Sequence, residues 1–301
     1  LLEIVEGEND KQRQLLLDEL LVQPAVPEGS ALFNQIRNEP HDPGRLNLEL
    51  VERYGDSVTK KRGGQGYVVV RNTDRSIGAR LSGLIARTHG DRGMDDAPLT
   101  VEMQGTAGQS FGVFNAGGLK LVLTGDANDY VGKGMAGGML VIRPPLGVSY
   151  KTHEAVIIGN TCLYGATGGE LYAAGTAGER FAVRNSGATA VIEGAGDHCC
   201  EYMTGGVVVI LGKTGVNFGA GMTGGFAYVL DIERDFVDLY NHELIDIHRI
   251  NPESMEAHLH HLRSLLVSHV DMTGSEWGDA ILEDYRTYLP KFWVVKPKAA
   301  E

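Results

Sequence analysis

The spacing of hydrophobic and polar positions divides this chain into three parts. In residues 1–65 and again in residues 232–301, apolar side chains recur every three or four positions, which is typical of amphipathic helices. In residues 66–231 they gather instead in short runs rich in Val, Ile and Leu, separated by glycine-rich segments. Short apolar runs bounded by glycine are typical of buried β-strands. The pattern therefore predicts a β-rich middle, 66–231, between a helical leader, 1–65, and a helical tail, 232–301.

Flanking residues place the individual elements. Helices are predicted at 10–22, 28–38, 46–54, 76–88, 252–266 and 276–288, and strands at 67–70, 119–123, 139–142, 155–158, 207–211 and 226–230. Asp10 and Asn251 are suitable N-caps, and Pro24 and Pro40 end the first two helices. Because the open ends of a stack of strands need a cover, we expect the helix at 76–88 to cover the first layer and the tail helices to cover the last.

The middle part repeats itself. Gly105-Thr-Ala-Gly108 returns as Gly175-Thr-Ala-Gly178, and Phe, Val, Asn and Gly follow both copies at matching positions (111/181, 113/183, 115/185 and 117/187). A finer period is marked by the glycines that directly precede strands, at 118, 138, 169, 187, 206 and 225. Most of these glycines lie 18 to 20 residues apart. Residues 105–231 contain 28 of the 41 glycines but only two of the ten prolines, which argues for ordered repeats rather than a low-complexity linker.

A repeat of this size predicts a layered fold. Nineteen extended residues trace a contour of roughly 60 Å, which three short strands and tight corners would close into one triangular coil. Stacked coils bury their apolar faces against their neighbours. We therefore predict an all-β core, a single-stranded right-handed parallel β-helix of about seven coils, with flanking α-helices at its N- and C-terminal ends. Its corners would be formed by the structural glycines of the repeat, Gly132, Gly134, Gly137, Gly138, Gly168, Gly169, Gly205, Gly206, Gly219, Gly221, Gly224 and Gly225.

Two segments of the repeat, 132–137 and 219–224, spell the dinucleotide-binding motif G-x-G-x-x-G. That motif must open a helix whose N-terminus faces the pyrophosphate. Here the residues that follow each segment have the composition of strands. Gly212-Lys-Thr214 also falls short of a P-loop, because Val207 stands where the first glycine is required. We expect β corners, and no nucleotide site, at all three places.

The motif Gly-x-Gly-Met-x-Gly-Gly, together with Gly-Thr-Ala-Gly, resembles the C-terminal GXGXG domain of the large (alpha) subunit of bacterial glutamate synthase. The flanks are also similar: 72–83 resembles the family's entry into a helix, and 273–276 and 288–292 resemble its closing segment. The resemblance extends from about residue 65 to about residue 295. The double-glycine repeat alone is shared with the C subunit of formylmethanofuran dehydrogenase, so repeat and flanks are needed together.

The resemblance implies a role within a larger enzyme. That family converts glutamine and 2-oxoglutarate into two glutamates with reducing equivalents from NADPH or ferredoxin, as part of ammonia assimilation. Its FMN, iron–sulfur cluster and glutaminase nucleophile belong to other domains, and FAD and NADPH bind to a partner subunit. No residue here matches them, so we expect no catalytic, cofactor-binding or metal-binding residue on this segment, which would be inactive by itself.

The resemblance also implies partners. The expected ones are the glutaminase and FMN synthase domains of the same parent chain, with the glutamate synthase small subunit as a further candidate. A rigid scaffold would hold the two domains in register, because ammonia must travel between them. The start at Leu1, without Met, is what a fragment would show.

Composition sets limits on other partners. The chain has 27 Lys and Arg against 39 Asp and Glu, a net charge of -12, which repels phosphate backbones and anionic membrane surfaces. No apolar run approaches the roughly 20 residues that span a bilayer. The three cysteines, 162, 199 and 200, are too few for a disulfide framework. We expect a cytoplasmic protein that binds neither nucleic acid nor membranes.

Four arginines make the segment around the helix at 76–88 locally basic: Arg71, Arg75, Arg80 and Arg87. Two interpretations remain open. The residues form either a solvated face with local ion pairs or an interdomain docking patch for an acidic partner domain.

Two clusters suggest chemistry that we do not expect. His258 and His261 lie at i, i+3 on one helix, but no H-E-x-x-H motif supplies the remaining metal ligands, so a polar helix face is expected. Asp197-His-Cys-Cys-Glu201 places an acid, a base and two thiols together. Adjacent side chains of a strand diverge, and the aligned copy of this segment at 127–131 has none of these groups. We interpret the segment as a variable corner.

Two functions of other classes remain open beside the scaffold. Some β-helices are carbohydrate-active enzymes, although aromatic residues are only 7% of this chain and charged residues are sparse on its strands. The other alternative is an assembly protein like the C subunit of formylmethanofuran dehydrogenase.

Overall fold

The computed structural model describes residues 7, 9–14, 16–22, 25–31, 33–34, 36, 44–251 and 255–299. The chain forms two compact units, residues 1–42 and residues 43–301. In the first unit, α1 (Asp10–Arg13) begins at the N-cap Asn9, whose side chain accepts a hydrogen bond from the Gln12 amide. The predicted helix at 10–22 is thus limited to one turn. The described residues between 28 and 36 are not helical, whereas Pro24, Leu32 and 37–38 lie outside the described residues.

The second unit contains the other helices and all strands among the described residues. The helices are α2 (Arg45–Thr59), α3 (Ala79–His89), α4 (Glu256–Thr273), α5 (Glu276–Glu283) and α6 (Tyr285–Tyr288). The strands are β1 (Gly64–Val70), β2 (Leu99–Ala107), β3 (Leu119–Ala127), β4 (Ala136–Arg143), β5 (Val156–Ile158), β6 (Gly168–Ala173), β7 (Thr176–Ala177), β8 (Ser186–Ile192), β9 (Thr204–Ile210), β10 (Gly224–Leu230), β11 (Ile245–Arg249) and β12 (Phe292–Pro297). Pro252, expected in the first turn of α4, lies outside the described residues.

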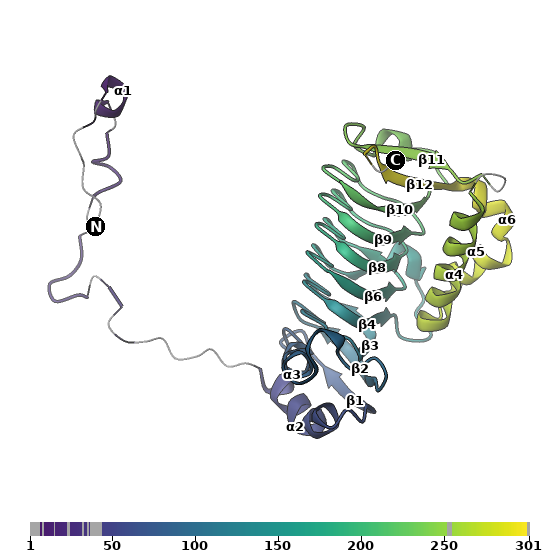
Figure 1. Ribbon diagram of the computed structural model, residues 1–301, viewed down its shortest axis with the longest axis horizontal. Coiled ribbons are helices and arrows are strands. Elements are labelled where there is room, and N and C mark those ends of the chain that lie inside the picture. Colours follow the sequence, from purple (N-terminus) through teal and green to yellow (C-terminus); the bar gives the residue numbers. More distant parts are fainter. Residues whose placement is uncertain are drawn as a thin grey trace. The chain divides into compact units, whose positions relative to one another are not determined.

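The strands form one mixed sheet of 12 strands in the order β1-β2-β3-β4-β6-β8-β9-β10-β12-β11, with β5 and β7 off this path. From β1 to β10, neighbouring strands pair in parallel, one strand for each repeat of about 19 residues. β12 then pairs antiparallel with both β10 and β11. Figure 1 shows the parallel strands following one another along the unit, with α4–α6 along one side of the sheet.

The expectation of an all-β, right-handed parallel β-helix with about seven coils of three strands is therefore wrong. The sheet is mixed, helices pack against it, and each repeat contributes a single long strand. The sides expected as further strands are turns, apart from the short β5 and β7. The physical reason lies in the backbone. The segments between the strands place positive φ at every second residue, and a β-strand does not allow this conformation.

These turns stack into a ladder. The turn ladder comprises residues 110–114, 130–134, 161–165, 180–184, 198–202 and 217–221, and the first, third and fifth residue of each segment has a φ between 54° and 69°. Amides two residues apart in a segment donate to opposite neighbouring layers: Gly132 N donates to Phe111 O, and Gly134 N donates to Tyr164 O. The ladder is thus hydrogen-bonded on both sides, as the sheet is.

Both ends of the stack are covered, the first by the expected helix α3 together with α2 and the second in a way that was not expected. At the first end, α2 and α3 pack on each other, and the Tyr54 hydroxyl of α2 occupies the space in which Gly66 of β1 would carry a side chain. At the other end, β12 rather than the tail helices covers the edge of β10, with Ala227 opposite Val295 and Leu230 opposite Phe292. α4 instead lies across β4, β6 and β8, on the outer face of the sheet. The expectation for the tail helices is therefore wrong.

Two hydrophobic clusters follow from this arrangement. The larger fills the space between the sheet and the turn ladder, where Leu121, Leu140 and Phe181 are fully buried. The smaller lies between the outer face of the sheet and the tail helices and includes Tyr228, Leu262 and Ile281. Within the described residues, no helix is both long enough and apolar enough to cross a bilayer.

Candidate functional site

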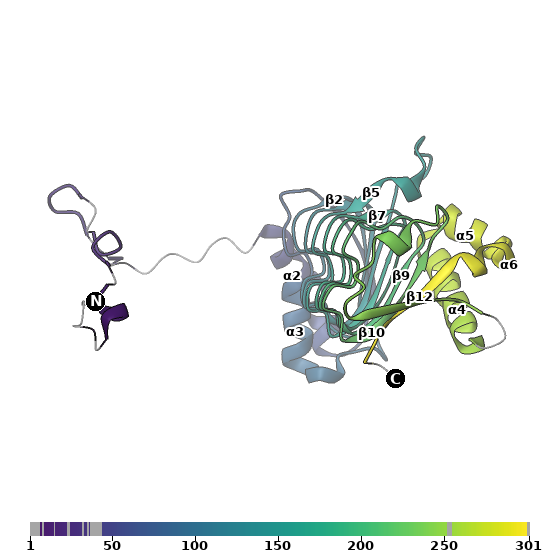
Figure 2. The same cartoon turned by 90° about the horizontal axis from the view of Figure 1, so that it is seen from above.

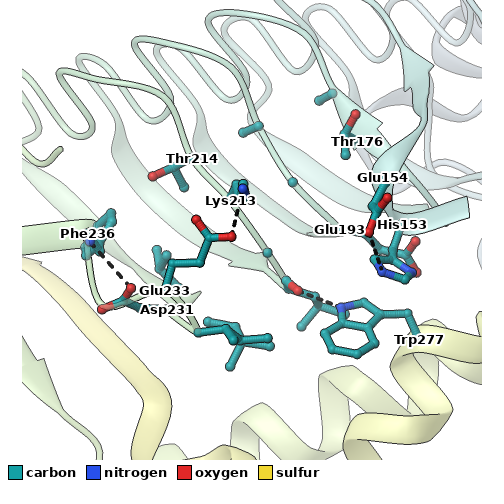
Figure 3. A pocket seen from close by; sticks show the side chains of 18 of the residues that line it. His153, Glu154, Thr176, Glu193, Lys213, Thr214, Asp231, Glu233, Phe236 and Trp277 are labelled. Carbon is teal, nitrogen blue, oxygen red and sulfur yellow. Dashed lines mark hydrogen bonds and ion pairs between the residues drawn. The ribbon is translucent and has the colours of Figure 1, made fainter. Parts of the chain in front are cut away.

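A cavity of about 710 Å³ in the second unit lies where β8, β9 and β10 end. Its walls are the loops 193–196, 211–214 and 231–236 together with His153 and Trp277 (Figure 3). The carboxyl ends of parallel strands meet at one edge of a sheet, so polar groups from successive repeats gather here. Each of these groups is a candidate for chemistry.

The exposed side of the cavity carries an ion pair and an aromatic wall. Lys213 Nζ lies 2.8 Å from Glu233 Oε1, and this hydrogen bond raises the pKa of Lys213. The amine therefore stays protonated and is unsuited to act as a base. The His153 ring stacks on Trp277 with centroids 4.7 Å apart, while Trp277 Nε1 donates to Leu211 O at 2.7 Å. Trp277 thereby ties α5 to the end of β9.

Asp231, at the end of β10, is almost fully buried and accepts several hydrogen bonds. Arg249 Nη2 donates to its Oδ2 at 2.9 Å, and Trp293 Nε1 donates to the same oxygen at 2.8 Å. The Asp235 amide donates to Oδ1 at 3.1 Å. The Arg249 guanidinium also lies over the Trp293 ring, 3.7 Å from its centroid. Asp231 thus joins β10, β11 and β12 and has no free capacity for a substrate.

Glu193, directly after β8, belongs to a second buried network. His269 Nε2 lies 3.1 Å from Glu193 Oε1, and the Ser275 hydroxyl donates to the same oxygen. Ser275 is also the N-cap of α5, accepting from the Gly278 amide at 2.8 Å. Ser275, Glu193 and His269 carry the three groups of a hydrolytic triad, but their arrangement differs from one. The Ser275 hydroxyl donates to the Glu193 carboxylate, so the His269 imidazole is not placed to take the hydroxyl proton. The network fastens α4 and α5 to the sheet.

The cysteines do not form a reactive or metal-binding site. Cys199 and Cys200 are buried in the turn ladder with their sulfur atoms 3.8 Å apart, and burial raises the pKa of Cys199. Burial likewise raises the pKa of Cys162 to about 12. An iron–sulfur cluster needs several converging thiolates, and these residues do not fit one. The segment 197–201 is a turn, as expected, with His198 at its surface and Cys200 inside.

The helix histidines contact aromatic rings. His258 Nδ1 lies 2.8 Å and His261 Nδ1 3.4 Å from the Tyr228 hydroxyl, and the Phe226 ring packs edge-on against His258. Among the described residues, no three His, Cys, Asp or Glu side chains are grouped to hold a metal ion. The expected polar helix face is therefore wrong for these two residues, which pack between α4 and β10.

This contact predicts a pH-dependent stability. Burial, then the positive charges of Lys296 and His261, hold the pKa of His258 below its ordinary 6.5. As the pH falls, the unfolded chain therefore binds this proton first. We expect the free energy of unfolding to be constant with respect to this group above pH 6.5 and to decrease as the pH falls from 6.5 towards 5.

Urea unfolding of wild type and His258→Gln between pH 6.5 and pH 5 measures the effect. The free energy of unfolding should decrease less in the variant than in wild type, because the variant lacks the His258 imidazole. His260→Gln serves as the matched control, because the His260 side chain is 69% exposed. An equal decrease in His258→Gln and wild type would show that another group is responsible.

The glycines singled out in the sequence lie where the turn ladder runs into the sheet. Both G-x-G-x-x-G segments are followed by strands, β4 and β10, as predicted. Gly138 has a φ of 70°, and a Cβ there would lie 2.3 Å from Leu119 O of the preceding layer. At Gly224 a Cβ would lie 2.1 Å from Thr204 O. Of the remaining ten, four lie in the turn ladder itself, Gly132, Gly134, Gly219 and Gly221, and six lie at the starts of strands, Gly137, Gly168, Gly169, Gly205, Gly206 and Gly225.

The four arginines are all exposed at the first end of the stack. Arg71 and Arg75 precede α3, whereas Arg80 and Arg87 lie on it, seven residues apart and therefore on one face. None of them forms an ion pair with any other residue that the structure describes. Local ion pairs thus do not account for them. Whether they dock a partner remains a prediction.

Sequence reasoning did not find the Glu193 and Asp231 networks. Their partners are 76 and 18 residues away along the chain, so spacing gave no indication. One signal was present: each is an acidic residue that directly follows an apolar strand, where a buried carboxyl requires partners.

Comparisons with known proteins agree with the repeat. The family model described as "GXGXG motif" matches residues 47–298. A "Ferredoxin-dependent glutamate synthase" of Pyropia yezoensis is 54% identical over 228 residues, 76% of this chain and 15% of the relative. A "Ferredoxin-dependent glutamate synthase 2" of Synechocystis is 58% identical over 226 residues, 75% of this chain and 14% of the relative. A "Glutamate synthase [NADH]" of Schizosaccharomyces pombe is 46% identical over 301 residues, 99% of this chain and 14% of the relative.

The chain thus spans about 15% of the length of the curated relatives it matches. The similarity covers the strands, the turn ladder and, in the yeast relative, the leader and tail as well. This chain belongs to the GXGXG motif family, as a GXGXG domain similar to those of glutamate synthases.

Proposed function

We propose that this chain is a non-catalytic structural domain of a glutamate synthase, and that it holds the glutaminase and FMN synthase domains of a longer polypeptide in register. The main support is that sheet and turn ladder are both hydrogen-bonded from layer to layer, which makes a stiff body. The relatives' names and the small share of their length that the chain spans add to this support.

In this proposal the chemistry takes place on other domains. Glutamine, 2-oxoglutarate and reductant would give two glutamates there, with FMN and an iron–sulfur cluster in the parent chain and FAD and NADPH on the small subunit. The polar groups around the cavity at the ends of β8–β10 fit a structural role, because Asp231, Glu193 and Lys213 each bond to protein partners. The cytoplasmic location expected from the composition belongs to the same proposal.

The first end of the stack would contact a catalytic domain. Arg71, Arg75, Arg80 and Arg87 are exposed there without ion pairs among the described residues, so an acidic domain surface would complement them. The two alternatives from the sequence, a carbohydrate-active enzyme and an assembly subunit, are not favoured by a particular observation. A general acid for glycoside chemistry requires a carboxyl with a raised pKa, whereas the cavity carboxyls Asp231 and Glu233 are paired with cations.

Deletion of residues 43–301 from the longer polypeptide tests the scaffold. We expect glutamine hydrolysis to continue while the glutamate formed per glutamine hydrolysed falls severalfold, because ammonia escapes before it reaches the synthase. The measurement is the ratio of the two rates, with Glu233→Ala in the intact polypeptide as a control that leaves the domain folded. An unchanged ratio after deletion would refute the scaffold role.

A further inference from the structure

Six side chains of the turn ladder, three exposed and three half-buried, form an aromatic–basic strip: Phe114, Arg184 and Tyr202, and Tyr130, Lys133 and Tyr164. Backbone hydrogen bonds place them in adjacent layers. Phe114 N donates to Lys133 O, and Arg184 N donates to Glu201 O, next to Tyr202. The ladder lies on the side of the stack away from α4–α6 (Figures 1 and 2), so the tail helices do not cover the strip.

The two most exposed rings of the strip rest on glycines of the next layer. A Cβ at Gly134 would lie 2.8 Å from Phe114 Cε1, and a Cβ at Gly221 would lie 2.4 Å from Tyr202 Cδ1. Phe114 is nevertheless 61% exposed and Tyr202 52% exposed. One face of each ring therefore packs on backbone while the other is open, which holds the ring in place at little cost in conformational entropy when a partner binds.

The cations of the strip lie among these rings. Lys133 Nζ is 5.3 Å from the centroid of Tyr130 and 5.8 Å from that of Tyr164, and Arg184 Cζ is 5.8 Å from the centroid of Tyr202. Neither Lys133 nor Arg184 forms an ion pair within the described residues, whereas Arg180 on the same ladder is paired with Glu201. Two fixed positive charges thus stand beside open aromatic faces without a counter-charge.

The backbone adds an independent observation. Phe114, Arg184 and Tyr202 occupy the fifth position of their ladder segments, where φ is 55°, 54° and 54°. Three other layers have glycine at this position, at 134, 165 and 221. A non-glycine residue there costs about 1 kcal/mol or more. Burial does not offset this cost, because all three side chains are exposed. The three exposed side chains are therefore held in a fixed backbone conformation by the layers around them.

We propose that the aromatic–basic strip is a docking surface for an acidic surface of another domain in the same longer polypeptide. The proposal rests on the function proposed above, which supplies that polypeptide. Tyrosine and arginine are the residues that most often dominate protein interfaces. Unpaired cations at the centre of such a surface select carboxylates opposite them. A nucleic acid is disfavoured, because the two unpaired cations of the strip, on a chain of net charge -12, give little attraction for phosphate backbones.

Hydroxyl-radical footprinting of the intact longer polypeptide tests the proposal. The probe is the oxidation rate of Phe114 and Tyr202, compared with the rate in this chain alone. We expect both rings to be protected at least about fivefold in the longer polypeptide. The double variant Lys133→Glu/Arg184→Glu should restore fast oxidation, whereas Arg263→Glu/Arg286→Glu, with the same charge change on the tail helices, should not.

Phe114→Gly and Tyr202→Gly separate docking from folding. Glycine relieves the positive φ at these positions, so each variant should unfold at the same or higher urea concentration than wild type. Each should also expose the other ring of the strip to oxidation in the longer polypeptide. Loss of urea stability in both variants would mean that the rings serve the fold, and would overturn the proposal.

These outcomes test the docking surface separately from the proposed scaffold role. Rings that are equally reactive in the longer polypeptide and in this chain alone would overturn the docking surface, even if domain deletion uncouples the two reactions. Protection that appears only on addition of nucleic acid or polysaccharide would overturn it as well. Protection of Phe114 and Tyr202 would support the docking surface. If deletion of residues 43–301 then left the glutamate formed per glutamine hydrolysed unchanged, the scaffold role alone would be refuted.

Discussion

Gly138→Ala is expected to lower the free energy of unfolding by about 3 kcal/mol or more. Two costs combine at this residue. Its φ of 70° strains any side chain, and the added Cβ would lie 2.3 Å from Leu119 O and 2.5 Å from Ala116 O. Both neighbours are backbone atoms of the preceding layer, held by ladder hydrogen bonds, so neither can move away without breaking its own contacts. Urea unfolding monitored by circular dichroism measures the loss.

Gly83→Ala is the matched control for this variant. Gly83 lies within α3, where no atom comes within 4 Å of an added Cβ. Alanine in an exposed helix interior is favoured over glycine, so this variant should gain about 0.5–1 kcal/mol. The same substitution would thus have opposite signs at two sites. If both variants lost stability equally, a general sensitivity to added methyl groups would explain the result better than the layered backbone does.

Asp231→Ala should have the second-largest effect, a loss of about 3 kcal/mol. The side chain is 1% exposed, and its removal leaves Arg249, Trp293 and the Asp235 amide without their acceptor. Arg249 is 35% exposed, so water can satisfy part of its charge, which keeps the loss at the lower end of the range for a broken buried pair. Because the network joins β10, β11 and β12, hydrogen exchange should also increase in β11 and β12.

The control is Glu233→Ala in the same cavity. Glu233 pairs with Lys213 at 2.8 Å, but the two side chains are 53% and 77% exposed. A solvated pair of this kind contributes little to stability. A double-mutant cycle with Asp231→Ala and Arg249→Ala then measures the coupling energy between these two side chains directly. A coupling energy near zero would show that Asp231 acts through packing alone.

The apolar runs of the sequence predicted several elements well. β3, β9 and β10 coincide with the strands expected at 119–123, 207–211 and 226–230, because these runs combine β-branched residues with bounding glycines. The glycine period indicated strands after Gly169 and Gly187, where β6 and β8 lie, but the apolar runs gave no range for either, because Glu170 and the small or polar residues at the start of β8 have weak β-propensity. β2, β7, β11 and β12 were missed. β11 alternates apolar and polar positions from Ile245 to Arg249, and this signal was open to detection.

The backbone conformation of the turn ladder could not be predicted from the sequence. Non-glycine residues such as Leu163 and Ala182 have φ values of 59° and 58°, although their side chains favour negative φ. Only the layers on either side, whose hydrogen bonds hold these residues, determine that conformation. The Glu193 and Asp231 networks have the same origin, since they join segments that meet only after the strands have stacked. Local propensity therefore predicted the repeat and its strands, whereas the geometry between layers decided the fold.

The reversal of direction at β12 limits the length of the molecule. Parallel layers are interchangeable, and each adds about 4.8 Å, so gain or loss of one whole repeat between β2 and β10 would change the span in discrete steps. No further parallel repeat can follow β12, because β12 runs opposite to β10 and β11 occupies its other edge. The antiparallel pair thus ends the run of parallel repeats and gives the stack a defined number of layers.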